Sequence, residues 1–269
     1  MNLTSPSQVK AWCIENGFHP NKVLGQNFLI DRNQLVSIVD AGFEGAVPDA
    51  EGGLGVLEIG PGLGVLTEEM LRRGAKVTAI EKDPVLAGRL KEALGDPPAL
   101  EVIAGDALAV KAEGRFSCMV SNLPYQAGTR ILLELVRQRE LPMLTVLVQT
   151  EVAERLAAKE GSKTRGLAGV WAQLDYDVKI VRKVPASCFW PRPEVGSSVV
   201  KLVRHGRNAD FPQECRKFFY GLTKKAFEHR RKQLGSIFKD LIQSTARAED
   251  LSNEDWLELT KGLMDNDHT

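Results

Sequence analysis

Residues 56–64 constrain the fold of this 269-residue chain more than any other stretch, with the sequence Val-Leu-Glu-Ile-Gly-Pro-Gly-Leu-Gly. An apolar run of β type ends here in three alternating glycines, and a helical pattern follows over residues 66–73. Because glycine has no Cβ, its backbone can turn sharply at the carboxyl edge of a sheet and lie against a ligand. A strand, a glycine turn and a helix in this order predict a cofactor-binding loop in an α/β protein.

Strand and helix patterns alternate from this loop onward, which predicts a doubly wound, Rossmann-like parallel sheet. The strands are expected at residues 56–59, 75–80, 100–104, 116–120 and 144–148. The helices are expected at residues 66–73, 84–94, 129–137 and 151–158, and a further helix ends at residues 170–174. Two later runs have the pattern of a closing hairpin, at residues 177–181 and 198–203.

The same patterns predict two domains. A catalytic domain is expected at residues 1–205, with a helical lid segment at residues 1–40, and a small helical domain at residues 206–269. Within the lid segment, Asp31 is the expected N-cap of a helix. The polar pair Gln26-Asn27 just before it is either a plain turn or part of a lid over a ligand.

Composition excludes several classes of protein. A hydrophobic content of 43% and a charged content of 26% are typical of a soluble globular protein. No apolar run is long enough to span a bilayer, and the first ten residues have no apolar signal core, so a cytoplasmic location is expected. The four cysteines lie far apart and form no Cys-x-x-Cys pair, which predicts reduced thiols and neither a metal site nor a disulfide framework.

Acidic residues follow two strands of the predicted sheet. Glu81 ends the strand after the glycine loop, and Asp106 ends the next one. Ligands of such sheets bind at the carboxyl ends of the strands, where Glu81 could accept from ribose hydroxyls and Asp106 from an adenine amino group. Either residue could instead be an ordinary helix N-cap. Their occurrence in register behind Gly60 favours a cofactor that contains adenosine.

The glycine spacing distinguishes between two such cofactors. The dinucleotide fingerprint needs a glycine where Val65 stands, which disfavours a nicotinamide dehydrogenase. With Glu58 two residues before the first glycine, the spacing resembles motif I of methyltransferases that use S-adenosylmethionine (SAM). Gly60 and Gly62 are then expected to contact the cofactor, although glycine turns after strands are also common without one.

Asn122-Leu123-Pro124-Tyr125 follows the fourth strand and is the most specific element. The N6 nitrogen of adenine is a poor nucleophile because its lone pair is delocalised into the ring. If the Asn122 side-chain carbonyl and the Pro124 backbone carbonyl each accept an N6 hydrogen, the lone pair can point at a methyl group. Tyr125 could then stack on the target base, a contact worth roughly 1–3 kcal/mol. The alternative is a plain Asn-x-Pro turn.

Eight segments together resemble the ribosomal RNA adenine dimethyltransferases of the small subunit (KsgA/RsmA type), from about residue 22 to residue 252. They lie at residues 24–29, 58–64, 81, 105–106, 122–125, 149–156, 189–195 and 226–232. The resemblance implies a SAM methyltransferase fold and N6,N6-dimethylation of two adjacent adenosines in the hairpin near the 3′ end of small-subunit rRNA. It also implies the cofactor-binding residues Asn27, Leu29, Gly60, Glu81, Asp106 and Asn122.

Four positions depart from the family pattern, namely Thr150, Glu194, Gly196 and Gly235. They lie outside the cofactor loop and put RNA contacts in doubt rather than the reaction.

The rival interpretations are an antibiotic-resistance methyltransferase of large-subunit rRNA, a ribosome-assembly factor that binds RNA without catalysis, and a DNA adenine methyltransferase. The match over residues 189–252 argues against the first, the intact glycine loop against the second, and Leu123 against the third.

The net charge is zero, but the charges are distributed unevenly. Residues 201–240 hold 11 basic and 4 acidic residues, an excess of +7, and residues 241–269 hold 2 basic and 7 acidic ones, an excess of −5. Arg230, Arg231 and Lys232 continue a helical pattern into the apolar positions 234, 237 and 238, and are expected to bind RNA phosphates from a solvated face. A purely solvated face is the alternative. The expected partner is rRNA in a ribosomal precursor particle, bound by a monomer without metal or membrane.

Overall fold

The computed structural model describes residues 1–21, 24–110 and 112–266, apart from the side chains of Asp240 and Asn266. Asp267, counted above in the acidic segment, lies outside these ranges. The chain divides into two compact units. The sheet unit comprises Met1–Ala153 and Lys179–Arg204, and the helical unit comprises Glu154–Val178 and His205–Thr269.

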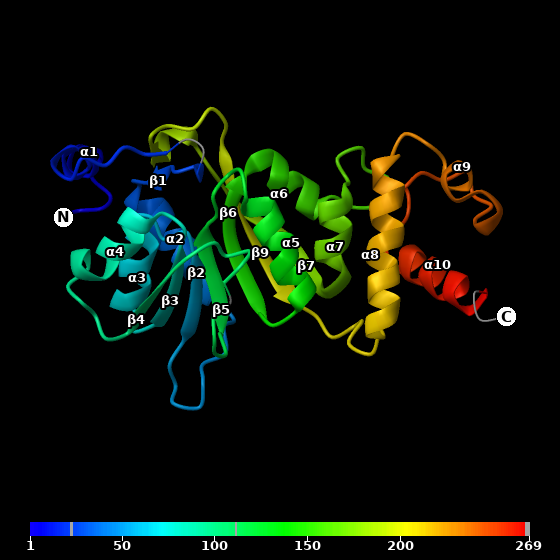
Figure 1. The fold of residues 1–269 in the computed structure, drawn as a ribbon, viewed down its shortest axis with the longest axis horizontal. Coiled ribbons are helices and arrows are strands. Elements are labelled where there is room, and N and C mark those ends of the chain that lie inside the picture. The colour runs from blue at the N-terminus through cyan, green and yellow to red at the C-terminus, as the bar shows by residue number, and fades with distance from the viewer. Residues whose placement is uncertain (22–23, 111, 267–269) are drawn as a thin grey trace. The chain divides into compact units, whose positions relative to one another are not determined.

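A seven-stranded sheet forms the centre of the sheet unit, in the order β4-β3-β2-β5-β6-β9-β7 (Figure 1). The strands are β2 (Gly55–Ile59), β3 (Lys76–Glu81), β4 (Leu100–Ala104), β5 (Cys118–Asn122), β6 (Met143–Gln149), β7 (Tyr176–Val184) and β9 (Ser197–Arg204). Strands β2 to β6 are parallel, and β9 pairs antiparallel with β6. The predicted doubly wound sheet is confirmed, and its strand order reverses between β2 and β5, where ligands of such folds bind.

The helices of the sheet unit follow the expected order. They are α1 (Pro6–Glu15), α2 (Arg32–Phe43), α3 (Val65–Arg72), α4 (Pro84–Ala93), α5 (Gly128–Gln138) and α6 (Thr150–Ala157), the last running into the helical unit. Asp31 caps α2 as predicted, because its side chain accepts from Gln34 N at 2.9 Å. Asp83 caps α4 in the same way, and Pro84 stands in the first turn of that helix.

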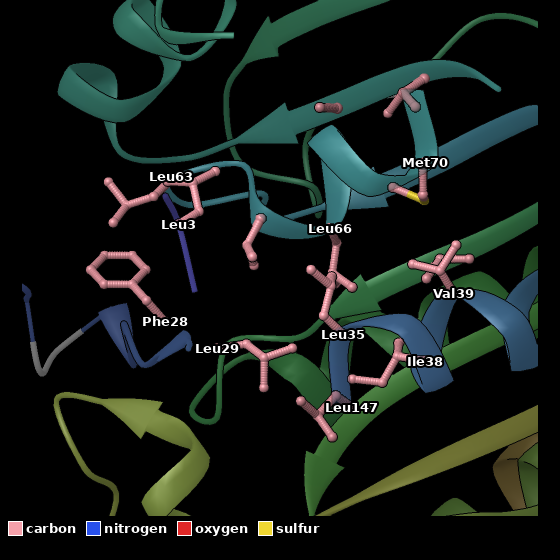
Figure 2. Close-up of a cluster of buried hydrophobic side chains, with 14 of the residues drawn as sticks. Leu3, Phe28, Leu29, Leu35, Ile38, Val39, Leu63, Leu66, Met70 and Leu147 are labelled. Atoms are coloured by element: carbon pink, nitrogen blue, oxygen red, sulfur yellow. The ribbon is translucent and has the colours of Figure 1, made fainter. Parts of the chain in front are cut away.

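A hydrophobic cluster joins the N-terminal segment to the glycine loop. Figure 2 shows Leu3 beside Leu63 and Phe28, and Leu66 of α3 close to Leu35 of α2. Phe28 lies in a two-residue strand, β1 (Phe28–Leu29), which pairs antiparallel with β8 (Phe189–Trp190). Along the chain, one turn of 3-10 helix, η2 (Ala186–Cys188), connects β7 to β8. This packing fixes the backbone on either side of the glycine loop.

The helical unit contains α7 (Leu167–Asp175), α8 (Gln213–Glu228), α9 (Leu234–Phe238), η3 (Lys239–Leu241) and α10 (Asn253–Asn266). Its core includes Phe219 of α8, the fully buried Trp256 of α10, and Val170 and Leu174 of α7. The sequence pattern predicts that residues 154–178 lie in the catalytic domain, whereas these residues belong to the helical unit. The reason is that α7 buries its apolar side chains in the core of that unit. Among the described residues, no helix is both long and apolar enough to cross a membrane.

Candidate functional site

The glycine loop connects β2 to α3 with all three glycines in a left-handed conformation. Their φ angles are +68° at Gly60, +60° at Gly62 and +90° at Gly64. A Cβ at Gly62 would lie 3.0 Å from the Phe28 ring, and one at Gly64 would lie 2.6 Å from Leu90 Cδ1. Only glycine satisfies both the backbone conformation and the close packing here.

A cavity of about 390 Å³ lies beside this loop at the carboxyl ends of the central strands. Its wall comes from the loop, the segment around β1, the ends of β3 and β5, the turn after β4 and the start of α5. The seven predicted cofactor residues all line it: Asn27, Leu29, Gly60, Gly62, Glu81, Asp106 and Asn122. The structure therefore brings together positions that are spread over about a hundred residues of sequence.

Glu81 is held by two backbone groups at the end of β3. Its Oε2 accepts from Gly62 N at 3.0 Å and its Oε1 from Asp83 N at 2.8 Å. The carboxyl is only 6% exposed, and this burial raises its pKa even though both N–H donors act to lower it. Each oxygen keeps a lone pair for a further donor, so the carboxylate can receive the hydroxyls of a ribose.

Asp106 lies after β4 and also lines the cavity. Its Oδ1 accepts from Leu108 N at 2.9 Å, and its Oδ2 pairs with Lys82 Nζ at 2.9 Å. These contacts hold the pKa of Asp106 below its ordinary value, with the Leu108 N–H contributing most. An ionised acceptor at this position fits the amino group of an adenine ring.

Asn122 is the last residue of β5, and its side chain is oriented by a distant backbone group. Its Nδ2 donates to Asn27 O at 3.0 Å. Because a carbonyl oxygen can only accept, the amide nitrogen must face Asn27, which leaves Oδ1 on the other side. Oδ1 is buried and has no hydrogen-bond partner among the described residues. A buried acceptor without a donor is costly, which favours a ligand N–H at this position.

The two residues that complete the predicted catalytic turn are placed differently. Pro124 lines the cavity, and its carbonyl oxygen accepts from Gly128 N at 2.7 Å, which leaves one lone pair for a second donor. Tyr125 is half-buried, and its hydroxyl lies 2.5 Å from Ser197 Oγ. Burial raises the pKa of this phenol. Its ring is not part of the cavity wall, so stacking on a target base remains a proposal for Tyr125.

Glu58, the acid of the loop motif, is buried beneath the loop. The Thr67 hydroxyl donates to its Oε2 at 2.6 Å. Burial raises the pKa of Glu58 from about 4.5 to about 8, and the nearby Glu81 adds to the rise, while Thr67 opposes it. The folded protein therefore retains a proton near neutral pH that the unfolded chain releases.

Glu58 should make stability fall with rising pH. Its contribution is fully present below pH about 4.5 and is lost as the pH passes through about 8, because the native state binds the extra proton in that window. Glu58→Gln cannot ionise, so the decline in its free energy of unfolding over this range should be shallower. Urea unfolding at several pH values between 5 and 8.5 measures this, and parallel curves for the two proteins would contradict it.

Arg230, Arg231 and Lys232 do not lie in a helix, contrary to the prediction. Helix α8 ends at Glu228 and α9 begins at Leu234, so the three residues form a turn between them. Arg230 donates to Glu249 Oε2 at 3.1 Å and to Lys163 O at 2.8 Å. Arg231 and Lys232 are exposed. The apolar positions of the pattern belong to α9, whose Leu234 and Phe238 are buried as expected.

Sequence reasoning missed the residues that hold the site together. Gln26, interpreted as part of a turn or lid, donates from Nε2 to Asp83 Oδ2 at 2.9 Å. The sequence predicts a helix that begins at Pro84, but nothing in it connects the start of that helix with residue 26. Gly235, one of the departures from the family pattern, has a local reason, because a Cβ there would lie 2.9 Å from Ser244 O.

Comparison with known proteins gives a consistent family. The family described as Ribosomal RNA adenine dimethylase matches residues 17–260. A Deinococcus radiodurans protein named ribosomal RNA small subunit methyltransferase A is 44% identical over 237 residues, covering 86% of this chain and 76% of the relative. A protein of the same name from Shouchella clausii is 38% identical over 258 residues, covering 91% and 83%.

Solved structures share the fold. A dimethyladenosine transferase from Plasmodium falciparum aligns with a TM-score of 0.76 at 24% identity, covering 89% of this chain and 98% of that one. The 23S rRNA methyltransferase ErmE aligns with a TM-score of 0.66 at 25% identity, covering 88% and 100%. The left-handed glycines and the two carboxylates at strand ends fit SAM as the cofactor. The chain belongs to the ribosomal RNA adenine dimethylase family and is a SAM-dependent methyltransferase.

Proposed function

We propose that the protein transfers methyl groups from SAM to the N6 atoms of two adjacent adenosines in small-subunit rRNA, giving N6,N6-dimethyladenosine. The relatives named for the small subunit support this substrate over the large subunit, since they are 38% and 44% identical to the chain, against 25% for ErmE. The observation that carries the reaction is the buried, unpaired Oδ1 of Asn122. This acceptor is of the kind that an adenine N6–H needs.

The chain's own groups act by orienting the target nitrogen. When bound, SAM supplies an electrophilic methyl group on a sulfonium. In the first transfer Asn122 Oδ1 and the second lone pair of Pro124 O accept the two N6 hydrogens, which draws the nitrogen towards tetrahedral geometry. Its lone pair is then available as a nucleophile. In the second transfer N6 carries one hydrogen, which one of the two acceptors holds, and each transfer releases one N6 proton to water. No general base is needed before transfer, because the amino group is already neutral and loses its proton only after alkylation.

Removing the Glu81 carboxylate should weaken cofactor binding. We propose that this group receives the ribose hydroxyls, and a charge-assisted hydrogen bond of this kind is worth about 1.5–3 kcal/mol, or roughly ten- to a hundredfold in affinity. Glu81→Ala should therefore show a higher Kd for SAM by isothermal titration calorimetry. An unchanged Kd in a folded variant would remove Glu81 from the cofactor site.

The substrate is tested with purified ribosomal subunits that lack the modification. The protein is incubated with methyl-labelled SAM and either small or large subunits, and the label is mapped by nuclease digestion. We expect two adjacent dimethylated adenosines in the small subunit. Label in the large subunit would favour the ErmE-type reaction, and SAM binding without any label would favour a non-catalytic assembly factor. A precursor particle as substrate and a monomeric enzyme are part of the proposal. The same assay with immature small-subunit particles checks the first, and sedimentation of the free protein checks the second.

Arg230, Arg231 and Lys232 are proposed RNA contacts. Arg231 and Lys232 are exposed, while Arg230 also donates to Glu249 and Lys163 within the helical unit, so the other two give the cleaner test. Replacing Arg231 and Lys232 by glutamine should weaken binding to the particle and make the slope of log affinity against log salt shallower by about 0.7–0.9 for each lost phosphate contact. Filter binding at several salt concentrations measures this. An unchanged slope would assign both residues to the solvated surface.

A further inference from the structure

Gln26 and Asn27 connect two elements beside the cavity. On one side, Gln26 Nε2 donates to Asp83 Oδ2 at 2.9 Å, at the start of α4. On the other side, Asn27 O accepts from Asn122 Nδ2 at 3.0 Å, at the end of β5. The segment therefore links the first turn of α4 to the amide that the proposed reaction depends on.

Both side chains of the Gln26–Asp83 hydrogen bond are fixed by backbone groups. Gln26 Oε1 accepts from Asn21 N at 2.7 Å. Asp83 is only 8% exposed, and its Oδ1 accepts from Val85 N at 3.0 Å and from Leu86 N at 3.3 Å. Each side chain is held in place by its own backbone contacts. The hydrogen bond between them therefore fixes residue 26 relative to the first turn of α4, because neither side chain can move without breaking one of those contacts.

The segment is also packed closely against the residues after Asn122. Gly25 has a φ of +66°, and a Cβ there would lie 2.9 Å from Tyr125 N. Immediately afterwards, β1 pairs with β8. Asn27 O thus lies between the Gln26–Asp83 bond and a strand pairing, and Asn27 Nδ2 also donates to Gly25 O at 3.2 Å. Loss of the Gln26–Asp83 bond would remove the one side-chain contact in this set that ties the segment to α4.

We infer that Gln26 and Asp83 are a positioning pair for methyl transfer. Their hydrogen bond holds Asn27 O where it receives Asn122 Nδ2, and this sets Asn122 Oδ1 as the acceptor facing the cavity. The inference rests on the proposed function of Asn122 and adds two residues that act through it. Misplacing a reacting group by about 1 Å can cost roughly a hundredfold in rate, so the link has a measurable kinetic effect.

The first test variant is Gln26→Glu. It keeps an acceptor for Asn21 N, loses the donor to Asp83 and places two carboxylates against each other. Single-turnover methyl transfer to small subunits should fall by about tenfold or more, because Asn27 O loses its support. Because residues 26 and 27 line the cavity proposed to hold SAM, the Kd for SAM should also rise, but by less than the rate falls, about threefold or roughly 0.7 kcal/mol.

The second variant restores the bond with its direction reversed. In Gln26→Glu combined with Asp83→Asn, the amide introduced at position 83 donates to the carboxylate introduced at position 26, while the remaining oxygen at 83 still caps α4. The double variant should recover the rate to within about threefold of the wild type, the non-additivity that marks a direct interaction. Such a rescue shows that residues 26 and 83 act through a direct hydrogen bond, and the larger loss in rate than in SAM affinity of the single variant separates positioning from cofactor contact.

Controls separate this inference from the proposed function. Gln8→Glu adds the same charge in α1, where Asn2 N donates to Oε1, and should leave the rate unchanged. A normal rate in Gln26→Glu, an equal loss of SAM affinity, or no recovery in the double variant would overturn the positioning pair. If Gln26→Glu does not fold, Gln26→Met removes the same bond without the charge. Asn122→Ala is assayed in parallel, and normal transfer by that variant would overturn the proposed function itself.

Discussion

Asn122→Ala should lose methyl transfer almost completely while still binding SAM. The substitution removes the buried Oδ1 that has no other partner among the described residues, so the acceptor for the target N6–H disappears. Removing one positioned hydrogen-bonding group from a site that stabilises a transition state costs about 10²–10³-fold in rate. Because the group acts mainly on the reacting nitrogen, the loss should fall on the single-turnover rate and much less on the Kd for SAM.

The control for this variant is a second asparagine outside the cavity. Asn16 ends α1 and donates from Nδ2 to Trp12 O at 2.8 Å. Asn16→Ala removes the same amide without touching the reacting groups, and its rate should stay near that of the wild type. Near-normal turnover by Asn122→Ala, in a variant shown by thermal unfolding to be folded, would rule out the orienting mechanism.

The sheet could be predicted because its signals are local. The run at 100–104 is bounded by turn residues and forms β4 at the same residues, and Pro84 marks the start of α4. The strand expected at 116–120 is shifted to Cys118–Asn122, which makes Asn122 the last residue of the strand. Polar residues at strand ends were sufficient to find the cavity wall, since parallel strands end at one edge of the sheet.

The contacts that orient the site could not be predicted, because they join distant parts of the chain. Asn122 and Asn27 are 95 positions apart, and Gln26 and Asp83 are 57 apart. The error at residues 230–232 has a similar origin. Helical spacing continues through this stretch into α9, but the chain turns there, and Arg230 pairs with a glutamate 19 residues later. Periodicity does not reveal a break that tertiary contacts stabilise.

Arg216→Met should destabilise the helical unit by about 3–5 kcal/mol, the cost of leaving one partner of a buried ion pair alone. Arg216 Nη1 lies 2.6 Å from Asp175 Oδ2, and both side chains are only 2% exposed. The guanidinium also donates to Phe211 O at 3.1 Å and to Asn208 O. Chemical denaturation followed by circular dichroism should show an earlier transition for the variant. A shift below about 1 kcal/mol would mean that water reaches the pair.

A second ion pair in the same unit shows why burial decides how much stability is lost when one partner is removed. Arg207 Nη2 lies 2.6 Å from Asp177 Oδ1, the same separation as in the buried pair, but these side chains are 59% and 63% exposed. Arg207→Met should therefore cost no more than about 1 kcal/mol, since water solvates the remaining carboxylate. Replacing both buried partners, with Asp175→Leu and Arg216→Met, should recover most of the lost stability because no lone charge is left. The recovery should be incomplete, since the carbonyls of residues 208 and 211 lose their donor. Equal losses in the buried and exposed single variants would contradict the argument from burial.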